Sequence, residues 1–138
     1  MAERESIDAG HKLKLKSVER GEKVMPEIKQ LCDTNRMTEG LANFLKGLPS
    51  MIKQNGLGQT IAFLKAKKDY DDIVCIFSKL LLSPGDTAGL MSKILNAPLS
   101  EYLFMQREAI EYAGWMKNFA QAFRIKTDTG GTDEPSAS

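Results

Sequence analysis

Apolar residues recur at helical intervals along almost the whole chain, and they show no sustained alternation with polar residues. The best-defined stretch runs from about Leu99 to Arg124. Its apolar positions are separated by steps of three or four residues: Tyr102, Met105, Ala109, Ala113, Met116, Ala120 and Phe123. Such spacing gives a helix a continuous apolar seam that can pack against other helices. The pattern predicts an all-α fold with a long C-terminal helix.

Shorter helical patterns precede this one and are separated by proline and glycine. Pro26 is expected to kink or restart the first, and Gly47 with Pro49 to break the second. Gly56 is expected to end a helix, since glycine tolerates the left-handed conformation found there. The predicted helical segments are 2–34, 38–54, 57–64, 69–81, 90–95 and 99–124. We expect a single compact bundle of about six helices over 1–126 and a disordered acidic tail over 127–138.

The chain offers little for catalysis or metal binding. His11 is the only histidine and lies among lysines, while Cys32 and Cys75 are far apart and belong to no CxxC pair. The cysteines are expected to be buried or half-buried free thiols. The sequence predicts no enzyme activity, no catalytic residue, no metal and no cofactor. The first residues lack the apolar core of a signal peptide and no apolar run is long enough to span a membrane, so a cytoplasmic protein without a membrane partner is expected.

The net charge is only +1, but the charges are unevenly distributed. No acidic residue lies between Glu39 and Asp69, a window that contains five lysines. Lys117, Arg124 and Lys126 form a second basic group near the C-terminus. Clustered lysines can follow a phosphate backbone without base-specific geometry, although a solvated helix face is the simpler interpretation. The backbone N–H of Gly58, in the first turn of a helix, is a weaker candidate for phosphate binding.

One ordered segment resembles a known family. It contains Leu48-Pro49, Met51-Ile52, Asn55-Gly56-Leu57, Gln59 and Ala62-Phe63-Leu64. These residues resemble the signature segment of the small helical subunit of the Cmr complex, the type III-B CRISPR RNA-guided effector. The C-terminal positions Tyr102, Arg107, Trp115, Lys117, Phe119 and Ala120 are also similar to that family's last helix. The resemblance covers roughly residues 40–125.

The resemblance implies a non-catalytic, structural subunit in antiviral defence. Such subunits stack on copies of themselves, lie beside the backbone subunits that hold guide RNA, and help hold target RNA. The candidate RNA-binding residues are Lys46, Lys53, Asn55, Gln59, Lys65, Lys67, Lys68, Lys117 and Arg124. The alternative is a free-standing helical adaptor that binds a protein partner through its apolar seam and uses lysines only for solubility.

Overall fold

The computed structural model describes residues 15–86 and 88–131, with side chains up to residue 123. In these ranges there are seven α-helices, one 3₁₀ turn and no strand. The elements are α2 (Lys16–Asp33), α3 (Glu39–Lys46), α4 (Leu48–Asn55), α5 (Leu57–Lys65), η1 (Lys68–Tyr70), α6 (Asp71–Leu81), α7 (Leu90–Asn96) and α8 (Leu99–Gly131). The predicted all-α fold with a long last helix is therefore confirmed.

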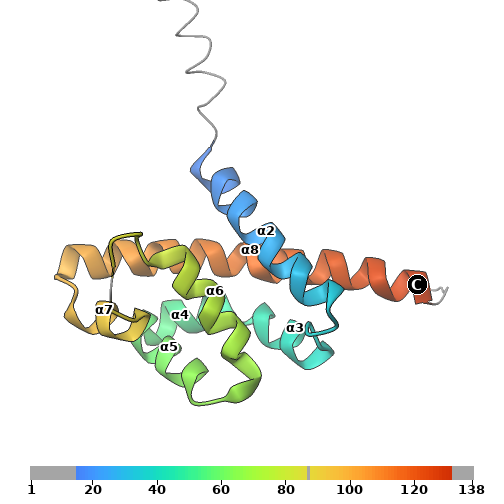
Figure 1. Ribbon diagram of the computed structural model, residues 1–138, viewed down its shortest axis with the longest axis horizontal. Coiled ribbons are helices and arrows are strands. Elements are labelled where there is room, and N and C mark those ends of the chain that lie inside the picture. The colour runs from blue at the N-terminus through green and yellow to red at the C-terminus, as the bar shows by residue number, and fades with distance from the viewer. Residues whose placement is uncertain (1–14, 87, 132–138) are drawn as a thin grey trace, which may run out of the picture.

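Helix α8 runs along the length of the molecule, and the shorter helices pack against it (Figure 1). Its predicted seam is the reason: Met105, Ala109, Ala113, Met116 and Ala120 are all at most 3% exposed. The three alanines allow neighbouring helices to approach closely, and the methionines fill the space on either side. The seam is thus used inside the chain as its core.

Helix α2 crosses α8 obliquely and is held by packing and by an ion pair (Figure 1). The indole ring of Trp115 lies against Gly21, where a Cβ atom would come within 2.9 Å of the ring. Beside this contact, Arg20 donates two hydrogen bonds to the carboxylate of Glu108, with Nε–Oε1 and Nη2–Oε2 distances of 3.0 and 2.7 Å. The Arg20 guanidinium holds the pKa of Glu108 below its ordinary value. Glu108 therefore stays ionised at neutral pH and fixes α2 on α8.

Replacing Glu108 by glutamine should remove part of the acid sensitivity of folding. Since the folded-state pKa is depressed, the pair's stabilisation is complete above the ordinary glutamate pKa and is lost as pH falls through the folded value. We expect Glu108→Gln to lower the free energy of unfolding by about 1–2 kcal/mol at neutral pH, with the difference shrinking in acid. Urea unfolding over a descending pH series measures this.

The matched control is Glu101→Gln. The Glu101 side chain is 45% exposed, and the distance from its Oε2 to Lys93 Nζ is 3.8 Å, which is long for an ion pair. This variant should be close to neutral across the series. A constant difference between Glu108→Gln and wild type at all pH values would contradict the pairing as the cause.

Several details differ from the sequence-based expectations. Helix α2 continues through Pro26 without a restart. Cys75, expected to be buried or half-buried, is an exposed thiol, while Cys32 is half-buried as expected. Helix α8 continues to Gly131, past the predicted boundary at residue 126. Residues 132–138 and His11 lie outside the described residues, so the tail stays a prediction.

Candidate nucleic-acid interface

The corner between α4 and α5 is a single glycine. Gly56 has φ +88° and ψ 158°, a conformation that is essentially restricted to glycine, and its N–H donates to the carbonyl of Ile52. The predicted helix stop is therefore confirmed. Because one residue makes the turn, α5 begins at Leu57, directly after α4 ends at Asn55.

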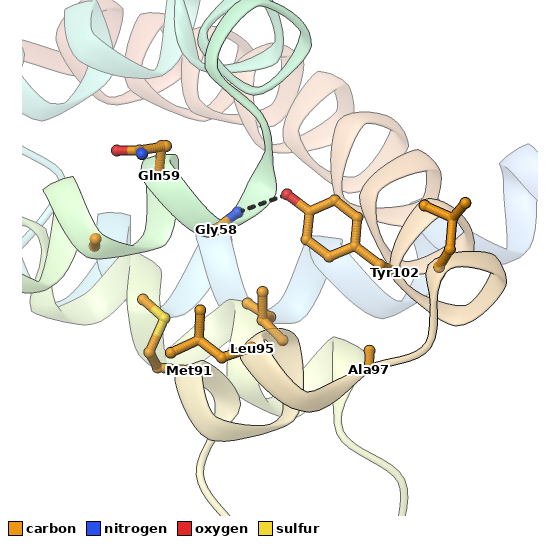
Figure 2. Close-up of a pocket in the computed structure, with 9 residues that line it drawn as sticks. Gly58, Gln59, Met91, Leu95, Ala97 and Tyr102 are labelled. Atoms are coloured by element: carbon orange, nitrogen blue, oxygen red, sulfur yellow. Dashed lines mark hydrogen bonds between the residues drawn. The ribbon is translucent and has the colours of Figure 1, made fainter.

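The first amides of α5 are already bonded within the protein. Leu57 N–H donates to Gln106 Oε1 at 2.9 Å, and Gly58 N–H donates to Tyr102 Oη at 3.1 Å (Figure 2). Both acceptors come from α8. The suggestion that the Gly58 amide binds a phosphate is thus wrong, because a side chain distant in sequence caps the helix. The local sequence does not predict these two caps, because both acceptors are more than 40 residues away along the chain.

The five lysines of the acid-free window are exposed. The side chains of Asn55 and Gln59, on either side of Gly56, are exposed as well. Lys46 ends α3, Lys53 lies in the last turn of α4, and Lys65 ends α5. Lys67 and Lys68 follow at the start of η1. The candidates are therefore spread over the α3, α4 and α5 side of the bundle. Arg124 lies on α8 beyond the last described side chain.

Two candidates from distant parts of the sequence meet in one groove. Lys53 and Lys117 line a hollow of about 330 Å³ between α4, α8 and the start of α2. The remaining lining residues are Ser17, Pro49, Ile110, Glu111, Gly114, Trp115 and Asn118. Its one carboxylate, Glu111, lies 3.9 Å from the Arg20 guanidinium. The structure thus brings one lysine from each predicted basic group to this groove, which Lys46, Lys65, Lys67 and Lys68 do not line.

Ion pairing distinguishes these lysines from cations elsewhere. Among the described residues, no carboxylate lies within 4.0 Å of any of six candidates: Lys46, Lys53, Lys65, Lys67, Lys68 and Lys117. By contrast, Lys29, Lys79 and Lys93 pair with Asp33, Glu27 and Asp86. The candidate lysines are consequently available to an external anion.

A second, larger hollow of about 830 Å³ lies between α5, α7 and the start of α8 (Figure 2). Leu95 and Leu99, which are 72% and 73% exposed, contribute apolar surface to it. Gln59 lines this hollow, away from the Lys53–Lys117 groove. The other lining residues are Gly58, Ala62, Met91, Ile94, Ala97 and Tyr102. The hollow is apolar in character, and no lysine is among these lining residues.

The described residues contain no group of three or more His, Cys, Asp or Glu side chains that could hold a metal ion. Likewise, none of the helices in the part of the chain that the structure describes has both the length and the apolar character needed to cross a bilayer.

Comparison with known proteins agrees with the sequence resemblance. The family model for CRISPR-associated protein (Cas_Cmr5) matches residues 16–123. The CRISPR system Cmr subunit Cmr5 of Thermotoga maritima is 43% identical over 77 residues, a match that covers 53% of this chain and 58% of the relative. The chain also superposes with a TM-score of 0.63 on the crystal structure of a CRISPR-associated Cmr5 family protein from Thermus thermophilus. That alignment has 25% identity and covers 80% of this chain and 98% of the other. Since the family model spans most of the chain, this protein belongs to the Cas_Cmr5 family of CRISPR-associated proteins.

Proposed function

We propose that this chain is a non-catalytic subunit of a type III-B Cmr ribonucleoprotein effector, where it helps hold target RNA through sequence-independent contacts. It would act in the cytoplasm beside copies of itself, the backbone subunits and the guide RNA. Family membership supports the placement in a Cmr assembly.

The observation that carries the RNA-holding role is the set of unpaired lysines. A phosphate backbone needs cations that are not neutralised by the protein's own carboxylates. The acid-free window supplies them on three consecutive helices, and α8 adds Lys117 to the groove that contains Lys53. Lysine suits such contacts because its ammonium group adapts to phosphates without fixed geometry.

The adaptor alternative is weakened in its original form. The α8 seam through which a partner was expected to bind is buried within the chain. A protein partner would have to use a different surface, such as the apolar hollow lined by Leu95 and Leu99.

The proposal predicts that Lys53→Gln with Lys117→Gln weakens target-RNA binding by the assembled effector. Each lost phosphate contact removes about 0.7 from the slope of log affinity against log salt for a single strand. Folding should change little, by about 1 kcal/mol or less, because Lys53 is exposed and Lys117, although half-buried, makes no ion pair with the described residues. Target-RNA affinity at several salt concentrations gives both the affinity and the slope.

The matched control is Lys29→Gln with Lys79→Gln, which removes the same charge from two paired lysines. This control should retain the wild-type slope. Equal losses in both double variants would mean that only net charge matters, and an unchanged slope in the groove variant would reject its role in RNA holding.

A further inference from the structure

Three aromatic side chains gather where α3, α5 and η1 meet. The rings of Phe44 and Tyr70 are stacked with centroids 4.1 Å apart and planes inclined by 18°. Phe63 lies beside both, with centroid distances of 6.2 Å to Phe44 and 6.0 Å to Tyr70. Phe44 and Tyr70 are half-buried and pack on the core, whereas Phe63 is 40% exposed. The cluster therefore presents one supported ring to solvent.

The ammonium group of a lysine lies over the exposed ring of Phe63. Lys67 Nζ lies over Phe63, 5.5 Å from the ring centroid, one helical turn further along the chain. Neither Lys67 nor its neighbours Lys65 and Lys68 has a carboxylate within 4.0 Å among the described residues. Asp69 and Asp71 flank Tyr70 in the sequence, whereas α5, which carries Phe63, contains no acidic residue.

A ring and an unpaired cation side by side match the two parts of a nucleotide. A base offers a flat π-surface for stacking, and the phosphate next to it offers a negative charge. A single exposed ring is small for a protein-docking patch, and Lys67, which lies over it, would be left unpaired under an apolar partner.

We propose that Phe63, supported by Phe44 and Tyr70, is a stacking platform for an unpaired base of single-stranded RNA. Lys67 moves from the ring face to the adjacent phosphate as the base takes its place. This inference rests on the RNA-holding function proposed above, and it adds a base-dependent but sequence-tolerant contact to the lysine contacts.

The test compares a short oligoadenylate with an abasic strand of equal length, which keeps the phosphates and lacks the bases. The full-length chain is titrated into each labelled strand at low salt, and binding is followed by fluorescence anisotropy. Wild type should bind oligoadenylate at least about fivefold more tightly than the abasic strand. Phe63→Leu should abolish that preference without changing affinity for the abasic strand, whereas Lys67→Gln should weaken binding to both.

Two further variants separate stacking from a structural effect. Phe104→Leu replaces another exposed phenylalanine, on α8, and should retain the wild-type preference. Phe63→Trp should also retain it, and its added indole fluorescence should be quenched by oligoadenylate and not by the abasic strand.

The outcomes are distinguishable. No binding of either strand by wild type would overturn the proposed function and this inference with it. Equal affinities of wild type for the two strands, or a preference that survives Phe63→Leu, would overturn the stacking platform alone. The cluster would then be a packing or protein-contact surface, while RNA holding by the lysines would stand.

Discussion

Replacing Gly21 by leucine should lower the free energy of unfolding by about 3 kcal/mol, which corresponds to a drop of about 10 °C in the melting temperature. A Cβ at Gly21 would lie 2.9–3.0 Å from three atoms of the Trp115 ring, and a leucine adds further atoms behind it. The ring has little freedom to withdraw, because it stacks on Phe119, which in turn stacks on Phe123. Thermal and urea unfolding measure the loss.

Gly114→Leu is the matched control on the opposite helix. A Cβ at Gly114 has no neighbour within 4 Å, and leucine favours a helix over glycine by up to about 1 kcal/mol. This variant should be neutral or slightly stabilising. The cause is checked by repeating Gly21→Leu in a Trp115→Ala background, where its cost should fall by at least about 1 kcal/mol. Additive effects would show that contact with the ring is not the reason.

The sequence predicts well those features that depend on one helix at a time. The α8 seam and the Gly56 stop follow from local spacing and backbone preference, and both are present in the structure. The contact of Gly21 with Trp115 depends on how α2 crosses α8. A glycine inside a helical pattern does not identify the ring that requires it, so this position could not be predicted.

The candidate site also has one part that the sequence predicts and another part that depends on how the helices pack. The acid-free window is visible in the sequence, and its lysines are unpaired because that window supplies no nearby acid. The packing of α4 against α8 decides which lysines line the same groove. The presence of Lys53 and Lys117 in one groove therefore could not be predicted from the sequence. The aromatic cluster was missed because Phe44 and Tyr70 fall on apolar stripes that indicate core residues.

Replacing Gly56 by alanine should lower the free energy of unfolding by about 2–3 kcal/mol, for two reasons. Its φ of +88° with ψ of 158° is strained for any residue with a Cβ. The added Cβ would also lie 3.2 Å from Tyr102 Oη and 3.6 Å from Gln106 Oε1, the two atoms that cap α5. Unfolding experiments measure the destabilisation, and hydrogen exchange should show faster exchange at the Leu57 and Gly58 amides.

Gly58→Ala, two residues later, distinguishes backbone strain from crowding. Gly58 is inside α5, and a Cβ there would make ordinary contacts of 3.6 Å with Ile94 and 3.8 Å with Tyr102 Oη. Alanine should therefore be neutral or stabilising by up to about 1 kcal/mol, with slow exchange of the capped amides retained. If Gly58→Ala were the more damaging change, close approach of α5 to α7 would be what requires glycine in this segment. If only Gly56→Ala is damaging, the corner depends on the one backbone conformation that lets α5 start directly after α4 and dock its first amides on α8.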